Sequence, residues 1–333
     1  GTMATKKTTK KAATAKSSPK KTTAAAATSK TTVTRVTSKT ETKKPEVKAT
    51  TVKPVESSSL RKKPESKLPR NLVNIVLAEV AGTFILTLVA LFSAYMMTPF
   101  YVGLALVVLV LGIGAVSGAH INPAVTFGLW TMRKVKTALV PFYWAAQFLG
   151  AMAAVVLMGA LSSGSFVINF DQFMTFSWAI FAVELVGMAV FMFGISAALS
   201  RTDLKDTSKA VVIGMSLTLG LVVSGALLPL AQNAAVQKYQ QEQADAAQHA
   251  QQSKDQRTYP REVYISGATL NPAVALAVTE KTNSQLQNAS APAQKTEKMY
   301  TRLSLEVIAA TLVGAALGGN LFLLIGYRNK VEE

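Results

Sequence analysis

The sequence predicts an all-α membrane protein in which six transmembrane helices and two re-entrant half-helices form an inverted repeat. Half of the 333 residues are hydrophobic, and several apolar runs approach the roughly 20 residues that a helix needs to cross a bilayer. A nine-residue string also occurs twice, each time among long apolar segments. These observations predict two related halves, each with three spans and one half-helix.

Residues 1–69 have a composition that predicts a disordered cytoplasmic tail. Residues 1–70 contain 19 of the 35 Lys and Arg residues but four of the 18 acidic ones. With almost no large apolar side chains, the segment cannot bury enough surface to offset the entropy lost on ordering. We expect a spacer or a contact to anionic lipid. The tail also resembles the basic tails of linker histones, so nucleic-acid binding stays open.

Six apolar segments follow within residues 70–330. Clusters of Lys and Arg flank them on one side, whereas the connections 97–100 and 162–175 on the other side contain neither residue. By the positive-inside rule, both termini are cytoplasmic. The predicted spans are Leu72–Met97, Phe100–Val116, Leu139–Leu161, Phe176–Leu199, Ala210–Leu230 and Leu303–Ile325.

A polar, Gln-rich insertion, residues 231–261, follows the fifth span on the outer side. Its composition is compatible with a polar helix over Val236–Ser253 or with disorder. The insertion belongs to the second of the two halves, which extend over about residues 70–165 and 174–327.

The repeated string reads SGAHINPAV at residues 117–125 and SGATLNPAV at residues 266–274, with seven of nine positions identical. In each copy an Asn, a favoured N-cap, precedes a Pro that suits the first position of a helix. The apolar stretch that follows is too short to span a bilayer. We therefore expect two half-helices that begin inside the membrane at Asn122 and Asn271.

The repeat extends beyond these strings. Glu79 and Glu184 each precede a Gly by three residues within a span, and Gln147–Ala151 aligns with Thr311–Ala315. A carboxylate within a span is costly unless it is satisfied. We expect each Glu to accept hydrogen bonds from the backbone of its re-entrant segment, with a proton or cation relay as the alternative. Because each half has an odd number of spans, the second half is inverted in the membrane relative to the first. Such inverted repeats are typical of transporters.

Small residues recur within the spans. They allow helices to approach closely, and we expect packing alone to explain them. They are Gly82, Gly103, Gly150, Gly187, Gly214, Gly220 and Gly314.

The paired Asn-Pro-Ala strings, the AEVAGTF sequence at residues 78–84 and the SGAHINPAVTF string together resemble the major intrinsic proteins, the aquaporins and glycerol facilitators. The resemblance covers about residues 70–327, without the tail and the insertion. It implies a channel domain of six tilted helices around a narrow pore, assembled as a homotetramer in the plasma membrane. It also implies passive passage of water and small uncharged solutes, with no cofactor or metal.

The resemblance places both Asn residues at the centre of the pore. If each caps its half-helix through the side-chain oxygen, each NH2 is free to donate into the pore. The facing positive ends of the half-helices would repel cations. The assigned pore residues are Asn122, Pro123, Ala124, Asn271, Pro272 and Ala273, with Glu79, Glu184 and His120 supporting the loops.

The residue after the second Asn-Pro-Ala departs from the family pattern. Most members have an Arg there, which narrows the outer mouth and excludes cations, whereas this chain has Val274. The family's other constriction positions correspond to Val102, Leu221 and Ala268. An aliphatic ring offers no donors to replace lost hydration, so we expect costlier water entry and weaker discrimination against small neutral solutes. A charged residue from the insertion would replace the missing Arg if the insertion folded over the mouth of the pore. The candidates are Arg257 and Arg261.

Two alternatives to a water and solute channel stay open. One is a facilitator mainly for urea, ammonia, peroxide or glycerol with low water flux. The other is a proton-coupled secondary transporter that uses Glu79 and Glu184 as coupling sites. An enzyme is not expected, because the chain has no Cys and its two histidines, His120 and His249, belong to no metal-ligand or nucleophile–base arrangement.

Overall fold

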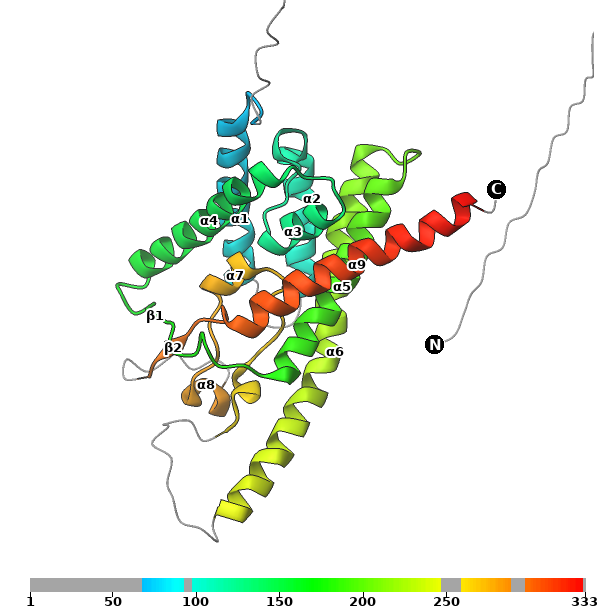
Figure 1. The fold of residues 1–333 in the computed structure, drawn as a ribbon. Coiled ribbons are helices and arrows are strands. Elements are labelled where there is room, and N and C mark those ends of the chain that lie inside the picture. The colour runs from blue at the N-terminus through cyan, green and yellow to red at the C-terminus, as the bar shows by residue number, and fades with distance from the viewer. Residues whose placement is uncertain (1–67, 93–97, 247–258, 289–296, 332–333) are drawn as a thin grey trace, which may run out of the picture. The chain divides into compact units, whose positions relative to one another are not determined.

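The computed structural model describes residues 68–92, 98–246, 259–288 and 297–331. Two short helices, α3 (Pro123–Thr131) and α7 (Pro272–Ala277), begin within the repeated strings and lie among the long helices (Figure 1). The predicted class of six spans with two half-helices is confirmed. The six helices that are long and apolar enough to cross a membrane are α1 (Leu72–Phe92), α2 (Thr98–Ser117), α4 (Val140–Leu161), α5 (Trp178–Ser200), α6 (Asp206–Ala246) and α9 (Leu305–Val331).

Helix pairs recur between the two halves. Helix α1 packs against α4, and α5 packs against α9 in the same way. A Cβ atom at Gly150 of α4 would collide with the carbonyl of Val80 in α1, and one at Gly314 of α9 would lie 2.6 Å from the carbonyl oxygen of Leu185 in α5. All seven predicted packing glycines lack room for a Cβ atom, so their packing role is confirmed.

The fifth long helix differs from the prediction. We expected a span over Ala210–Leu230, followed by an insertion that forms a polar helix over Val236–Ser253 or is disordered. The structure shows instead that α6 is continuous through Ala246. The segment beyond the apolar part is rich in Ala and Gln, which are good helix formers, so the helix continues past the internal Pro229. At 1.5 Å per residue, the part beyond Leu230 adds about 24 Å.

Other predicted segments lie partly or wholly outside the described residues. These are the tail up to residue 67, the end of the first predicted span at residues 93–97, and residues 247–258 of the insertion. A short helix, α8 (Asn283–Gln287), and two short 3-10 helices, η1 (Thr137–Leu139) and η2 (Arg261–Tyr264), complete the helical elements of the described part.

Two short strands join the connection before α5 to the segment before α9. Strand β1 (Ile168–Asn169) pairs in parallel with β2 (Met299–Tyr300), with Ile168 opposite Met299. An antiparallel bridge between Thr279 and Thr301 lies next to this pair in the sequence. The segment before α9 is therefore held to the connection before α5 and to the segment after α7.

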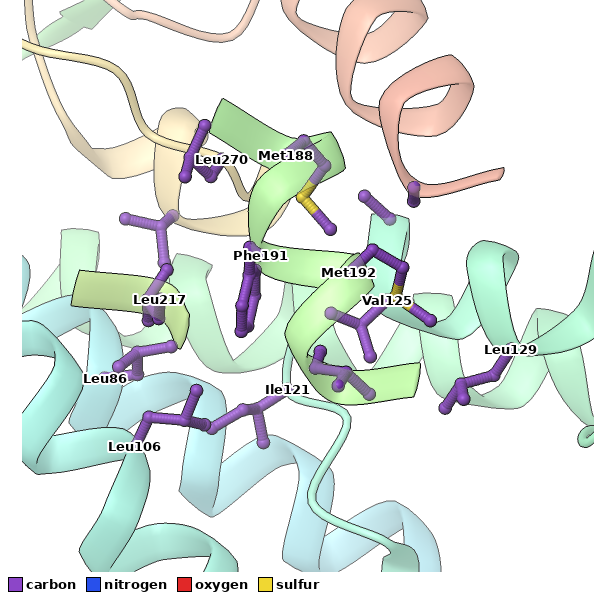
Figure 2. Close-up of a cluster of buried hydrophobic side chains, with 14 of the residues drawn as sticks. Leu86, Leu106, Ile121, Val125, Leu129, Met188, Phe191, Met192, Leu217 and Leu270 are labelled. Carbon is purple, nitrogen blue, oxygen red and sulfur yellow. The ribbon is translucent and has the colours of Figure 1, made fainter. Parts of the chain in front are cut away.

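The main hydrophobic cluster lies where the two halves meet (Figure 2). Lipid tails are as apolar as these side chains, so close packing rather than removal from water stabilises the cluster. Its labelled members are Leu86 of α1, Leu106 of α2, Val125 and Leu129 of α3, Met188, Phe191 and Met192 of α5, Leu217 of α6, and the loop residues Ile121 and Leu270.

Candidate pore site

Each half-helix begins at the Asn of its string. The side-chain oxygen of Asn122 accepts a hydrogen bond from the backbone N–H of Ala124 (2.9 Å), and that of Asn271 accepts one from Ala273 (3.0 Å). The proline after each Asn stands at the first helical position, where its missing N–H has no cost. Helices α3 and α7 are nine and six residues long, so neither can cross a bilayer.

The two strings are joined directly by their Asn side chains. Asn122 Nδ2 donates to the carbonyl of Leu270 (2.7 Å), and Asn271 Nδ2 donates to that of Ile121 (2.9 Å). The expectation that both NH2 groups are free is therefore wrong in part, because one N–H of each is bound to the other half. The second N–H of each NH2 group has no partner among the described residues.

Backbone strain coincides with this junction. Ile121 and Leu270 have φ angles of 41° and 52°, a left-handed conformation that is unfavourable for branched and bulky side chains. Such strain persists only where surrounding contacts impose it, and it is concentrated at functional sites. Here it falls on the two residues whose carbonyls link the halves.

Glu79 of α1 accepts four hydrogen bonds and is fully buried. Its Oε1 accepts from the Ser117 hydroxyl (2.7 Å) and the backbone N–H of His120 (2.9 Å). Its Oε2 accepts from the backbone N–H of Ile121 (2.6 Å) and from Gln147 Nε2 (2.9 Å). The carboxylate thus satisfies the backbone of the first re-entrant segment, and all four donors are neutral.

Helix α4 holds the same segment from the other side. The His120 ring stacks on Tyr143 with centroids 4.2 Å apart, and its Nδ1 lies 3.1 Å from the Thr126 hydroxyl. The Tyr143 hydroxyl donates to the carbonyl of Ser117 (2.5 Å), and Gln147 Nε2 also donates to Thr126 (3.0 Å). The orientation of the first half-helix is therefore determined jointly by α1 and α4.

Glu184 of α5 makes the corresponding contacts to the second re-entrant segment. Its Oε1 accepts from the backbone N–H of Thr269 (2.9 Å), and its Oε2 accepts from that of Leu270 (2.9 Å). A further donor to Oε1 is the guanidinium of Arg302 (2.9 Å). The two carboxylates are therefore alike toward the backbone and different in their side-chain partners.

Arg302 is a site residue that the sequence analysis missed. The repeat pointed instead to Thr311, the counterpart of Gln147, but the Thr311 hydroxyl donates to the carbonyl of Val307 within α9 (2.7 Å). Arg302 Nη2 also lies 3.3 Å from the carbonyl oxygen of Gly267, in the loop before α7. Arg302 lies in the second half but outside the motifs that the two halves share, so comparison of the halves could not find it.

The four residues assigned to the constriction belong to one hydrophobic cluster. Val102 and Val274 are 7% and 5% exposed, and Leu221 and Ala268 are partly buried against the same cluster. They come from α2, α7, α6 and the loop before α7. None of these side chains has a hydrogen-bond donor.

Arg261 is occupied by other contacts. Its Nε donates to Glu280 Oε1 (2.7 Å) and its Nη1 to Glu306 Oε1 (2.5 Å), and both carboxylates are fully buried. Nη1 also donates to the Thr175 hydroxyl (2.8 Å). The suggestion that Arg261 replaces the missing constriction charge is therefore not supported, and Arg257 lies outside the described residues.

Comparison with known proteins gives one family. The sequence model of the family described as "Major intrinsic protein" matches residues 69–238. Aquaporin NIP2-1 of Oryza sativa subsp. japonica is 28% identical over 170 residues, which cover 48% of this chain and 57% of the relative. The probable aquaporin NIP7-1 of Arabidopsis thaliana is 32% identical over 172 residues, covering 46% and 61%. The chain thus spans somewhat more than half the length of the curated relatives it matches.

A solved structure of the aquaglyceroporin from Plasmodium falciparum also matches. Its sequence is 19% identical, and the match covers 75% of this chain and 95% of that chain with a TM-score of 0.45.

Proposed function

Because the chain belongs to the major intrinsic protein family, we propose that it is a passive channel for water and small uncharged solutes. The observation that carries the proposal is the junction of two half-helices inside a six-span membrane protein, made by the reciprocal hydrogen bonds of Asn122 and Asn271. The remaining N–H of each Asn would donate to a passing oxygen atom. The two positive helix ends would repel cations. The curated relatives named as aquaporins support the same function.

The proposed constriction is the aliphatic set Val102, Leu221, Ala268 and Val274. Their membership in one cluster supports this assignment. A solute that loses its hydration in such a ring gains no hydrogen bond in return. The preference for water over other small neutral solutes should therefore be weaker than in a ring with an Arg. The same feature favours the second candidate, a facilitator mainly for urea, ammonia, peroxide or glycerol with low water flux.

A proton-coupled transporter is less well supported. Both oxygens of Glu79 and of Glu184 accept hydrogen bonds from the backbone of the re-entrant segments. A carboxylate bound in this way holds the loop in place, and protonation during each transport cycle would disturb that loop. Saturable, proton-dependent uptake would favour the transporter.

The proposed channel is a homotetramer in the plasma membrane with cytoplasmic termini. The distribution of Lys and Arg among the short connections supports this orientation. The basic tail would then contact anionic lipid or nucleic acid on the cytoplasmic side. Salt-sensitive binding that disappears when residues 3–68 are removed, with flux unchanged, would separate these tail contacts from transport.

Stopped-flow light scattering of proteoliposomes tests the channel. Wild-type protein should raise the permeability to water, and to at least one of urea, glycerol and ammonia, above that of empty vesicles. Asn122→Ala and Asn271→Ala should each lower these fluxes, because each removes a cap and a donor at the junction. Asn233→Ala, at an exposed position of α6, is the matched control. Wild-type permeability equal to that of empty vesicles would exclude the channel.

A further inference from the structure

We propose that Arg302 determines the cation exclusion of this channel by neutralising Glu184 beside a constriction that lacks an Arg. The inference rests on the proposed channel function and adds a specificity-determining residue outside both Asn-Pro-Ala strings. It assigns to Arg302 an electrostatic role, carried out without direct contact between the guanidinium and the transported solute.

The pair is buried and adjoins the loop that carries part of the constriction. Arg302 Nη2 and Glu184 Oε1 lie 2.9 Å apart, and the two side chains are 2% and 0% exposed. The same carboxylate binds the backbone of Thr269 and Leu270, which directly follow Ala268 in the sequence. A change in the charge of this pair therefore acts within a few residues of the proposed ring.

The segment around Arg302 also contacts the far end of the half-helix. Thr301 Oγ1 donates to the carbonyl of Ala275 in α7 (2.9 Å), and the backbone N–H of Arg302 donates to that of Val278 (2.8 Å). The backbone thus binds the C-terminal end of α7, and the Arg302 side chain binds the loop at its N-terminal end. The guanidinium is therefore held in a defined position relative to Val274.

The first half-helix has no comparable cation among the described residues. Glu79 accepts only from neutral donors, Gln147 among them. Helix α3 has nine residues and α7 has six, so more peptide dipoles are aligned at the end near Glu79. The second half lacks that longer dipole as well as the family's Arg. The positive charge of Arg302 beside Glu184 compensates for the shorter helix dipole and for the missing Arg.

Stability alone does not account for Arg302. Its Nε and Nη1 have no hydrogen-bond partner among the described residues, although both atoms are buried. A buried ion pair often costs more in desolvation than its attraction returns, above all when some of its N–H groups are unsatisfied. A Gln, as at position 147, would donate to the carboxylate at a lower cost. The presence of a full charge therefore indicates an electrostatic role.

Removing the charge gives a specific expectation. In Arg302→Gln, the Glu184 carboxylate would keep its backbone donors but lose its counter-ion. An uncompensated charge in buried surroundings acts over several ångströms. Since the ring side chains carry no positive charge, cations should then enter more readily.

Proteoliposomes that contain a potassium- or proton-sensitive dye provide the test, with water permeability measured on the same vesicles. Arg302→Gln should raise the cation leak about tenfold or more while water flux stays near the wild-type level. Arg302→Lys keeps the charge and should not leak. Arg302→Met, a neutral side chain of similar length, should leak as Arg302→Gln does. Arg201→Gln, which breaks an exposed ion pair, is the control.

Two results would overturn the proposal. One is Arg302→Gln with normal water flux and no cation leak, and the other is Arg302→Lys with a cation leak as large as that of Arg302→Gln. If Arg302→Gln does not fold, Arg302→Met decides, because it removes the charge and leaves the Glu184 carboxylate on its backbone donors. Arg302→Met without a cation leak would contradict the electrostatic role. Absence of any wild-type flux would refute the proposed function itself, which is a separate outcome.

Discussion

At the scale of single residues, Val274 has the largest consequence for what the proposed channel carries. Its backbone N–H is 3.3 Å from the Asn271 oxygen and so belongs to the cap of α7, while its side chain lies in the central cluster. A residue at this position is held rigidly by the half-helix and is close to the junction. We therefore expect the chemistry of its side chain to alter selectivity without altering the fold that holds it.

Val274→Arg should lower urea and glycerol flux more than water flux. The guanidinium narrows the constriction and also adds donors, which can replace the hydration of a water molecule but cannot enlarge the passage for a bulkier solute. Stopped-flow permeability to water, urea and glycerol measures the ratio. Val274→Leu, which adds bulk without donors, is the control and should lower all fluxes. Equal losses for every solute in Val274→Arg would indicate that Val274 lies away from the constriction.

At the scale of helices, paired glycines determine how closely the spans approach. Gly103 of α2 and Gly214 of α6 face each other, and a Cβ atom at Gly103 would lie 2.7 Å from the Gly214 carbonyl oxygen. Gly187 of α5 and Gly220 of α6 are related in the same way, with a distance of 2.9 Å from a Cβ at Gly187 to the Gly220 carbonyl oxygen. Helix α6 is therefore in close backbone contact with one helix from each half.

Gly214→Ala should destabilise the protein, because the added methyl group would force α6 away from α2. Overpacking of this kind costs about 1–3 kcal/mol. Gly225→Ala is a matched control on the same helix, since a Cβ atom there meets no other atom within 4 Å. Alanine is also the better helix former, so the control should be neutral or slightly stabilising. Thermal unfolding in detergent, followed by intrinsic fluorescence, measures both; equal midpoints would contradict the close-contact interpretation.

At the scale of the whole membrane domain, polar contacts around the second half-helix connect segments that are far apart in the chain. Arg261 of η2 binds Glu280, after α7, and Glu306 in the first turn of α9. It also binds Thr175 in the connection before α5. Gln232 of α6 donates to the carbonyl of Ile265 (3.0 Å). These contacts hold the connections around the second half-helix together.

Arg261→Gln should lower the stability of the domain strongly, because it removes a guanidinium that pairs with two buried carboxylates. Breaking a buried pair by removing one partner costs about 3–5 kcal/mol. Arg201→Gln is the control, since its pair with Asp203 is exposed and should contribute little. The unfolding midpoint in detergent distinguishes the two variants. A loss of similar size in both would show that the Arg261 contacts are not coupled to folding.

Much of the fold could be predicted because the relevant signals are local. Apolar runs long enough to cross a bilayer located the six spans, and Asn followed by Pro located both half-helix starts. The sequence did not predict that α6 continues beyond Leu230. The composition changes there from apolar to polar, which marks the end of the apolar stretch but not the end of the helix. Helix propensity continues where hydrophobicity stops.

The sequence by itself determined the inverted repeat, the two capped half-helices and the aliphatic residue that follows the second Asn-Pro-Ala. Tertiary structure alone decided how the two strings join and which cation pairs with Glu184. Asn122 binds a carbonyl 148 residues away, and Arg302 binds a carboxylate 118 residues away. Neither partner has a local signature, because hydrogen bonds and ion pairs depend on distance in space, which the packing of the helices determines.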